Sequence, residues 1–325
     1  MRHAEKSLLV IGGSGFFGKS VLDAFRRGLL APWGIGRIIV VARQASRMRA
    51  WHPLLVAQGV ELIDLDIGTA SALPHADYVL HAASSSDARN YAANPLAERA
   101  NILAAIENYC RIAARDHQGS RIVYASSGAV YGQQPADVAQ LREDFTPGDA
   151  AGLVAYKRDY AEAKRLSEDA LARLGARGLA VSVARCFAFA GAYLPRDQHF
   201  AIGNFIADGL AGRPVRVLAT RPVVRSYMHA DDLVRWLMTI AHDGDATCPT
   251  YNVGSDEAVT MHQLAAAVAA RFGVGIDAAE ITDDTPDLYV PSIAKARDAL
   301  GLTLDYDLTR AIDAVAARLR TAEAA

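Results

Sequence analysis

The sequence has few cysteines, very few lysines and no long uncharged apolar run. Its three cysteines, Cys110, Cys186 and Cys248, lie far apart and form no CxxC or Cys/His cluster. We therefore expect free thiols in a reducing cytoplasm, with neither a disulfide framework nor a metal site. No apolar stretch approaches the roughly 20 residues that a membrane-spanning helix needs, so we expect no membrane partner.

Neither sign of charge dominates the 325 residues, because 34 Lys+Arg stand against 36 Asp+Glu for a net charge of −2. A general nucleic-acid binder needs a basic face, so we expect no nucleic-acid partner. Hydrophobic residues make up 51% of the chain, which is enough for a large core. Lysine occurs at only five positions, which are Lys6, Lys19, Lys157, Lys164 and Lys295.

Short β-branched runs alternate with segments of helical period in the first half of the chain. The predicted strands are residues 7–11, 37–41, 60–64, 78–81, 121–126 and 180–186. The predicted helices are residues 16–27, 46–58, 95–115, 156–174, 229–242, 260–272, 293–300 and 308–319. Nearly all-apolar strands are typical of a parallel sheet that is buried on both faces. The alternation predicts an α/β fold with a Rossmann-type doubly wound parallel sheet.

Glycine and proline interrupt the regular pattern after Cys186 as far as about Arg225. We therefore predict a dinucleotide-binding domain formed by residues 1–186 and about 226–253. The remaining residues, about 187–225 and 254–325, are predicted to form a smaller α/β substrate-binding lid. Open α/β sheets bind ligands at the carboxyl edge of the strands, where such a lid would be useful.

A glycine-rich turn follows the first predicted strand directly. Its sequence from residue 12 to residue 18, GGSGFFG, has the spacing G-x-x-G-x-x-G and leads into a helix. This arrangement suits a pyrophosphate, which needs close backbone approach and the free N–H groups of a helix start. Gly-rich turns also serve purely structural purposes. The predicted cofactor contacts in this turn are Gly12, Ser14, Gly15, Phe16, Phe17 and Gly18.

The second predicted strand ends without the Asp or Glu that usually holds the ribose 2′-hydroxyl of NAD. Arg43, Ser46 and Arg47 follow it instead. A planar guanidinium suits a phosphate because it donates two hydrogen bonds at once. We therefore predict that NADP(H) is preferred and that NAD(H) is possible; the alternative is that the two arginines only solvate a loop.

Tyr160 and Lys164 lie four residues apart on one predicted helix and therefore share a helical face. A phenol with a usual pKa near ~10 is a weak base at neutral pH, but an adjacent ammonium favours its phenolate. Upstream, Ser126, Ser127 and Gly128 end a predicted strand at the ligand-binding edge. We predict that Ser127 polarises the substrate oxygen that exchanges a proton with Tyr160, with Lys164 as the third catalytic residue.

These motifs together resemble the extended short-chain dehydrogenase/reductase superfamily, in its nucleotide-sugar epimerase, dehydratase and ketoreductase branch. The resemblance covers nearly the whole chain. It rests on the glycine loop, Asp66-Ile67, His81-Ala82-Ala83, Asn101, residues 126–132, Tyr160/Lys164, Arg185-Cys186-Phe187, residues 225–232, residues 251–255 and residues 292–302.

The resemblance implies further contacts with the two ligands. The implied cofactor contacts are Asp66, Ile67, Ala82, Ala83, Asn101 and Phe187, besides Tyr160 and Lys164. The implied contacts with a nucleotide-diphosphate sugar are Ser84, Ser126, Ser127, Gly128, Asn204 and Arg225. Arg225 corresponds to the arginine that grips the diphosphate. The resemblance also implies a homodimer that forms through the helices at residues 95–115 and 156–174.

Dehydratases of this branch follow the catalytic hydroxyl residue with an Asp-Glu pair, whereas this chain has Gly128 and Ala129. We therefore expect no 4,6-dehydratase. The favoured prediction is an NADPH-dependent 4-keto-6-deoxyhexose reductase that acts at C4 of a nucleotide-diphosphate sugar. A 4-epimerase with tightly bound NAD is the alternative, and a non-catalytic dinucleotide-binding sensor is a remote one.

Overall fold

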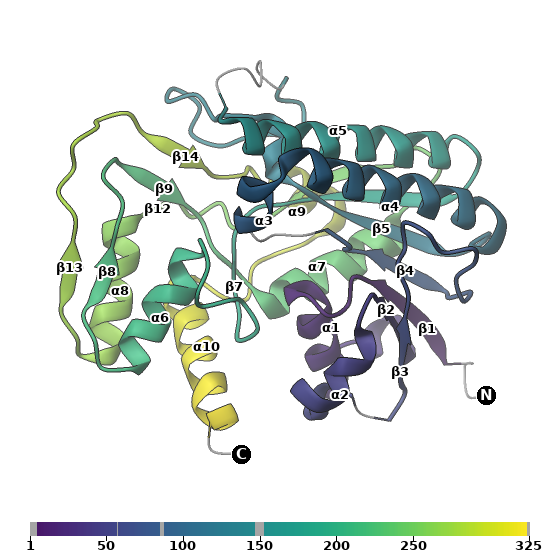
Figure 1. Ribbon diagram of the computed structural model, residues 1–325, viewed down its shortest axis with the longest axis horizontal. Coiled ribbons are helices and arrows are strands. Elements are labelled where there is room, and N and C mark those ends of the chain that lie inside the picture. Colours follow the sequence, from purple (N-terminus) through teal and green to yellow (C-terminus); the bar gives the residue numbers. More distant parts are fainter. Residues whose placement is uncertain (1–4, 57, 85–87, 147–152, 324–325) are drawn as a thin grey trace. The chain divides into compact units, whose positions relative to one another are not determined.

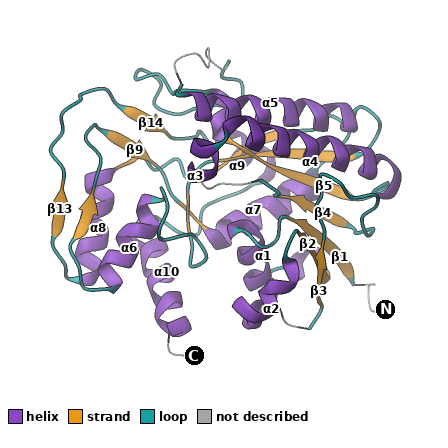
Figure 2. Ribbon diagram, viewed as in Figure 1, coloured by secondary structure: helices purple, strands orange, loops and turns teal. Residues whose placement is uncertain are grey.

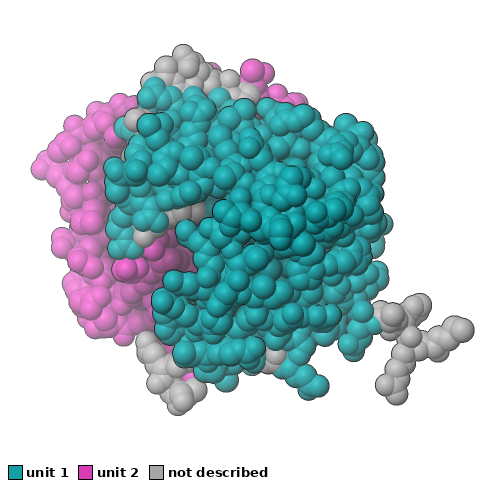
Figure 3. Space-filling view, turned by 45° about the vertical axis from the view of Figure 1, so that its right-hand side comes forward, with its two compact units in different colours: residues 1–130, 153–186, 234–251 teal, residues 131–152, 187–233, 252–325 magenta. Residues whose placement is uncertain are grey.

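The computed structural model describes residues 5–56, 58–84, 88–146 and 153–323 (Figure 1). The chain divides into two compact units, which Figure 3 colours separately. The first unit comprises residues 1–130, 153–186 and 234–251. The second comprises residues 131–152, 187–233 and 252–325. The assignment of cofactor binding to one domain and substrate binding to the other stays a prediction.

A seven-stranded sheet with the order β11-β6-β5-β4-β1-β2-β3 forms the centre of the first unit (Figure 2). Its strands are β1 (Lys6–Ile11), β2 (Ile35–Ala42), β3 (Val60–Asp64), β4 (Tyr78–His81), β5 (Arg121–Ser127), β6 (Ala180–Cys186) and β11 (Thr250–Val253). The pairs among β1 to β6 are all parallel. The predicted Rossmann-type fold is confirmed, and the six predicted strands agree with the observed ones to within two residues, whereas β11 was not predicted.

Helices α1 (Phe16–Arg26), α4 (Pro95–Asp116) and α5 (Ala155–Gly175) agree with the prediction. The single helix predicted for residues 46–58 is wrong, because the described part of this stretch is divided into α2 (Met48–Trp51) and two short 3₁₀ turns, Ala45–Arg47 and Pro53–Leu55. Proline lacks the N–H that a continuing helix needs, and Pro53 therefore starts a new turn. The short helix α3 (Ala88–Ala93) was not predicted.

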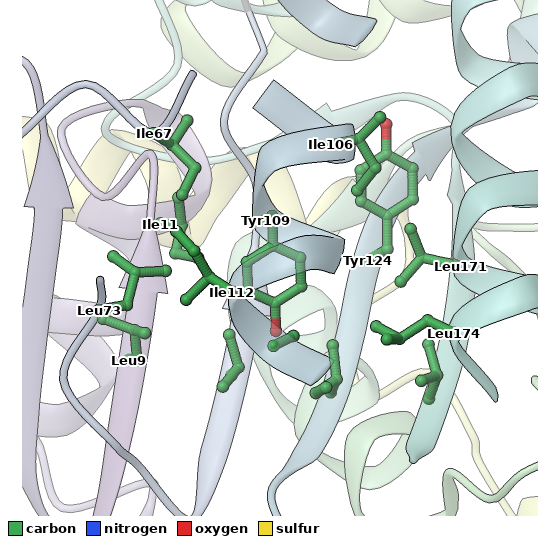
Figure 4. Packing of buried hydrophobic residues seen from close by; sticks show 14 of the residues in the cluster. Leu9, Ile11, Ile67, Leu73, Ile106, Tyr109, Ile112, Tyr124, Leu171 and Leu174 are labelled. Carbon is green, nitrogen blue, oxygen red and sulfur yellow. The ribbon is translucent and has the colours of Figure 1, made fainter. Parts of the chain in front are cut away.

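The core of the first unit lies between the sheet and two helices that run side by side, α4 and α5 (Figure 1). Leu9 and Ile11 of β1 belong to one buried cluster with Tyr109 of α4 and Leu171 of α5 (Figure 4). Alternate residues of a strand point to opposite faces of a sheet, so the equally buried Leu8 serves the other face. This packing fixes α5, the helix that carries Tyr160 and Lys164, on the sheet.

The second unit contains several small sheets and helices. Three of its sheets have the strand orders β12-β9-β14, β13-β8 and β10-β7. These strands are β7 (Phe189–Ala190), β8 (Val215–Val217), β9 (Val223–Arg225), β10 (Met228–His229), β12 (Val259–Thr260), β13 (Ile276–Ala278) and β14 (Asp287–Tyr289). Its helices are α6 (Ala201–Leu210), α8 (Met261–Phe272), α9 (Ala294–Leu300) and α10 (Leu308–Glu323), while α7 (Ala230–Asp243) crosses the boundary between the units. Helix α6 was missed because glycines and prolines surround it in the sequence.

The three cysteines are free thiols, as expected. Burial raises the pKa of the Cys110 thiol to about 11 and that of Cys186 to about 12, so both resist ionisation and reaction. Of the helices in the described part of the chain, none combines the length and the apolar character that a membrane crossing requires.

Candidate active site

Two glycines of the G-x-x-G-x-x-G motif, Gly12 in the loop after β1 and Gly18 in the first turn of α1, are required by the fold itself. Gly12 has a φ of +86°, and a Cβ there would lie 2.6 Å from the backbone nitrogen of Ala83. A Cβ on Gly18 would lie 2.1 Å from the carbonyl oxygen of Gly13. Any side chain at either position would therefore push the loop away from β4 or α1 away from the loop.

Gly15 is different, because the fold does not require a glycine there. Its φ is −83°, and a Cβ would meet only the Gly12 carbonyl oxygen at 3.5 Å, an ordinary contact. Gly15 is the N-cap of α1, and no side chain caps the helix and no acidic residue lies in its first turn. The open N–H groups and the missing side chain leave a cradle that fits a pyrophosphate, so the loop suits a nicotinamide dinucleotide. Ser14 is exposed beside it, and Phe16 and Phe17 form an edge-to-face pair.

A carboxylate does lie beside the end of β2, contrary to the sequence interpretation. Asp64, the last residue of β3, pairs with Ala42 at the end of β2. Its two oxygens accept hydrogen bonds from the backbone nitrogen of Ser46 at 2.7 Å and from the Ser46 hydroxyl at 2.5 Å. The Ser46 hydroxyl is therefore engaged by Asp64, and the predicted contact of Arg43, Ser46 and Arg47 with a phosphate stays a prediction. Arg43 is exposed, while the Arg47 guanidinium lies over the ring of Trp51, 5.4 Å from its centroid.

The other implied cofactor contacts of this unit lie along the same edge of the sheet. Asp66 accepts a 2.9 Å hydrogen bond from the backbone nitrogen of Gly68, and Ile67 is part of the buried core. Ala82 and Ala83 follow β4 and are half-buried. Asn101 is exposed on α4. The structure contains no ligand, so the roles of these residues stay predictions.

Lys164 is buried and joins α5 to β5. Its side chain is 2% exposed, and its Nζ atom donates to the Tyr124 hydroxyl at 3.1 Å and to the Ala125 carbonyl oxygen at 2.9 Å. The same ammonium lies 5.8 Å from the ring centroid of Tyr160, which is half-buried on the preceding turn of α5. Ser127 ends β5, and its hydroxyl oxygen accepts a 3.2 Å hydrogen bond from the backbone nitrogen of Ala129. The three predicted catalytic residues therefore belong to one unit and to two adjacent elements.

The hydroxyl of Ser126 is engaged within the protein, and the substrate-binding role predicted for this residue stays a prediction. Its hydroxyl is buried and donates a 2.5 Å hydrogen bond to Glu168. Glu168 also accepts a bidentate pair from Arg185, with distances of 3.1 Å and 2.7 Å to one carboxylate oxygen. Successive strand residues point to opposite faces, so the side chains of Ser126 and Ser127 lie on opposite faces of β5. The sequence did contain a signal for Glu168. Tyr160, Lys164 and Glu168 are spaced four residues apart, so Glu168 lies on the same face of α5 as the two predicted catalytic residues.

A second phenol, Tyr91 of α3, was missed by the sequence interpretation. Its ring packs edge-on against the ring of Tyr160, with centroids 5.2 Å apart and planes at 77°. Burial, and next the neighbouring Tyr160, raises the pKa of Tyr91 well above its usual range, although a hydrogen bond with Ser84 opposes the shift. Tyr91 therefore stays protonated at neutral pH. Ser84, an implied substrate contact, is engaged by this phenol.

His81, the last residue of β4, lies beneath the site. It is 1% exposed, and its ring packs against Tyr109 and Tyr124 with centroid distances of 4.9 Å and 5.5 Å. Burial and the positive charge of Lys164 lower the pKa of His81 to about 3. The imidazole is therefore neutral at physiological pH and cannot serve as an acid there.

The implied ligand contacts of the second unit are Asn204, Arg225 and Phe187. The Asn204 amide donates a 2.7 Å hydrogen bond to the Gln198 carbonyl oxygen, and its own buried side-chain oxygen has no hydrogen-bond partner among the described residues. Arg225 pairs with Asp287 at 3.0 Å.

The aromatic surroundings of Arg225 include Tyr289, whose ring centroid lies 5.9 Å from the guanidinium carbon and 4.6 Å from the ring of Phe187. The salt bridge to Asp287 occupies part of the guanidinium. Gly128 starts the 3₁₀ turn Gly128–Tyr131, and its role, like those of Asn204, Arg225 and Phe187, stays a prediction.

Comparison with known proteins identifies the family. The model of the NAD dependent epimerase/dehydratase family matches residues 8–254. UDP-glucuronic acid decarboxylase 6 from Arabidopsis thaliana is 28% identical over 304 residues, which cover 90% of this chain and 83% of that protein. Two solved structures share the fold. UDP-glucose 4-epimerase from Thermotoga maritima, with UDP-glucose, has a TM-score of 0.79 at 19% identity and covers 98% of this chain and 99% of its own.

The second structure is dTDP-glucose 4,6-dehydratase from Streptomyces venezuelae with NAD and TYD bound, which has a TM-score of 0.80 at 19% identity and covers 98% of each chain. The resemblance inferred from the sequence motifs is therefore confirmed. The protein is an enzyme that belongs to the NAD dependent epimerase/dehydratase family.

Proposed function

We propose that this enzyme oxidises and reduces C4 of a nucleotide-diphosphate sugar. The observation that carries the proposal is the arrangement of Ser127, Tyr160 and Lys164 on β5 and α5 in the unit that holds the glycine loop. A proton-transferring phenol, a hydroxyl and a buried ammonium are the groups that interconvert an alcohol and a ketone. Gly15 and the first turn of α1 would hold the dinucleotide, which supplies the hydride chemistry when bound.

Each of the three side chains has a separate task in this proposal. Tyr160 takes the proton from the C4 hydroxyl of the sugar, or returns it, through its phenol oxygen. Ser127 donates a hydrogen bond to the same sugar oxygen and so keeps it in place. The buried charge of Lys164 stabilises negative charge that develops on the phenol oxygen. Gly128 and Ala129 cannot transfer protons, which is why we do not propose dehydration.

We favour a net reaction without consumption of cofactor, in which C4 is oxidised and then reduced again within one cycle. The reductase prediction depended on a missing carboxylate at the end of β2, and Asp64 removes that reason. The activities named for the relatives, epimerisation of UDP-glucose and decarboxylation of UDP-glucuronic acid, support a UDP-hexose or UDP-hexuronic acid as substrate. Reduction of a 4-keto-6-deoxyhexose with NADPH is the second candidate, which the exposed Arg43 supports.

The test is a set of incubations of the purified enzyme with UDP-glucose, UDP-glucuronic acid and a nucleotide-linked 4-keto-6-deoxyhexose, the last with NADH or NADPH. Formation of UDP-galactose, or of a UDP-pentose and carbon dioxide, supports the cycle that retains its cofactor. Stoichiometric oxidation of NADPH with the keto sugar supports the reductase instead. The proposal would be overturned if the folded enzyme converted no sugar and oxidised no cofactor in any of these mixtures.

Two further predictions depend on the family resemblance. We propose a homodimer that forms through α4 and α5, and the exposed Leu96 and Leu166 on these helices suit such a contact. Sedimentation equilibrium tests it by comparing the oligomeric state of the wild-type chain with that of a Leu96→Lys, Leu166→Glu double variant.

The cytoplasmic location stays a prediction, which fractionation of the host cell tests.

A further inference from the structure

Asp64 lies where the adenosine end of a dinucleotide belongs. The backbone nitrogen of Gly12 donates to the Val41 carbonyl oxygen at 2.8 Å, so the glycine loop is attached to the end of β2. The Leu65 nitrogen donates to the Ala42 carbonyl oxygen at 3.0 Å and attaches the end of β3 to the same place. With the pyrophosphate on the first turn of α1, the adenosine ribose lies at the carboxyl end of β2.

The Asp64 carboxylate is accessible and negatively charged at this position. The hydrogen bonds from Ser46, together with the charge of Arg47, lower the pKa of Asp64, so the group is ionised at neutral pH. Asp64 is exposed, and one of its two oxygens takes the Ser46 hydroxyl proton. That hydroxyl is therefore not available to donate to a ligand phosphate. Each carboxylate oxygen has a second lone pair that can still accept a hydrogen bond.

Two cations lie near this carboxylate and would favour a phosphate if they were free to reach it. Arg47 follows Ser46 directly, but its guanidinium lies over Trp51. Arg43 is exposed one residue after the end of β2. A bidentate phosphate contact needs a guanidinium fork that points at the phosphate, and the Arg47 fork lies over the Trp51 ring instead.

We propose that Asp64, which comes from β3 and not from β2, selects the cofactor of this enzyme. Its carboxylate accepts a hydrogen bond from the free 2′-hydroxyl of the ribose and repels a 2′-phosphate, so NAD(H) binds more tightly than NADP(H). The inference rests on the proposed function only in that a nicotinamide dinucleotide binds at the glycine loop. It replaces the preference for NADP(H) that the sequence alone suggested.

Equilibrium binding of NAD⁺ and NADP⁺, measured by calorimetry without any sugar, tests the proposal in the wild-type enzyme and in Asp64→Asn. Wild type is expected to bind NAD⁺ more tightly. Removal of one negative charge beside a phosphate dianion should strengthen NADP⁺ binding by about tenfold relative to NAD⁺. The Asp64→Asn variant keeps the size of the side chain and an acceptor for the Ser46 nitrogen, and its thermal melt confirms that it is folded.

Two matched variants separate the carboxylate from its surroundings. Glu61 is a second exposed carboxylate on β3 and pairs with Arg37. Glu61→Gln removes one negative charge from the same strand and should leave the ratio of the two affinities unchanged. Ser46→Ala keeps the Asp64 carboxylate and should keep the preference for NAD⁺.

The proposal is overturned if wild type prefers NADP⁺, if Asp64→Asn leaves the ratio unchanged, or if Glu61→Gln or Ser46→Ala shifts it as strongly as Asp64→Asn. An unchanged ratio in an enzyme that still turns over its sugar refutes the role of Asp64 alone. Failure of wild type to bind either dinucleotide refutes the proposed function as well.

Discussion

The ammonium of Lys164 donates a 2.9 Å hydrogen bond to the carbonyl oxygen of Ala125. Ala125 lies on β5 two residues before Ser127, and Lys164 lies on α5 one turn after Tyr160. Together with the packing of α5 on the sheet, this contact holds the helix that carries the phenol in place relative to the strand that carries the hydroxyl. Because the acceptor is a backbone atom, no side-chain rotation on β5 can release it.

The same contact predicts a stability cost for Lys164→Met. The variant keeps the long aliphatic stem but leaves the Ala125 carbonyl and the Tyr124 hydroxyl without their donor. We expect the free energy of unfolding to fall by about 1–3 kcal/mol, as for other buried groups that lose a partner. Urea unfolding measures it. Lys157→Met, at an exposed position of the same helix, should change it by less than about 0.5 kcal/mol. Equal effects of the two variants would contradict the structural role of Lys164.

Tyr160→Phe should lower the turnover of the preferred sugar nucleotide by about 100-fold or more, because the variant lacks the atom that moves the proton. The affinity for NAD⁺ should change by less than about twofold, since the ring and its packing against Tyr91 remain. Tyr156→Phe on the same helix is the control and should retain turnover. A Tyr160→Phe variant as active as wild type would remove Tyr160 from the mechanism.

The two kinds of glycine in the β1–α1 loop should respond differently to alanine. Gly12→Ala puts a Cβ 2.6 Å from backbone at a positive φ and should destabilise the fold by about 2 kcal/mol or more. Gly15→Ala meets no such contact and should leave the melting temperature nearly unchanged. It should weaken NAD⁺ binding by about tenfold or more, since its methyl group enters the pyrophosphate cradle. Retained NAD⁺ affinity in Gly15→Ala would place the dinucleotide elsewhere.

Glu168→Gln should destabilise the enzyme by about 3 kcal/mol, because it removes the carboxylate charge that pairs with the largely buried Arg185. The side chains of this pair are 13% and 16% exposed. Glu162, which lies on α5 like Glu168, forms a more exposed pair with Arg99 of α4. Glu162→Gln breaks this pair and should cost less than about 1 kcal/mol. Chemical unfolding of both variants under identical conditions provides the comparison, and similar losses would refute the assignment.

His81 predicts a particular pH dependence of stability. Its pKa is about 3 in the folded protein and near ~6.5 in an unfolded chain, so the unfolded chain binds the proton more readily. The stability that comes from neutral His81 is complete above the unfolded pKa and is lost as the pH falls towards the folded pKa. The stability advantage of wild type over His81→Phe should therefore shrink by about 1 kcal/mol between pH ~7 and ~5.5. A constant difference would show that His81 does not titrate in this way.

The sequence was sufficient for the parts of the molecule in which the signal is local. Strands such as β1 and β4 are largely apolar runs, and Tyr160 and Lys164 are one helical turn apart, so both could be predicted. The contact of Asp64 with Ser46 could not be predicted. It joins the end of β3 to the turn after β2, and no local sequence pattern reveals the register of these two strands. The hydrogen bond from the Ser126 hydroxyl to Glu168 could not be predicted either, because the two residues are 42 positions apart in the sequence.

The short helices mark the second limit of prediction. The residues at 46–58 have helical composition, but Pro53 and the requirements of the β2–β3 connection divide them into three turns. Tyr91 lies in a segment without any periodic pattern, and only the packing of α3 on α4 and α5 brings its ring to Tyr160. Such tertiary contacts override local preference, as is usual for segments of one or two turns.

The central claim is that the enzyme oxidises C4 of a nucleotide-linked sugar. The most direct measurement uses UDP-glucose and UDP-glucuronic acid carrying deuterium at C4, incubated in a single turnover with stoichiometric enzyme and NAD⁺, followed by mass spectrometry of the nicotinamide. The account predicts that quenching during the turnover finds deuterium on the nicotinamide with at least one of the two sugars in wild type and none with Tyr160→Phe, and that the deuterium is again at C4 in the finished product. Conversion of the labelled sugar to product by wild type with no deuterium on the nicotinamide at any time in a rapid-quench series would contradict it.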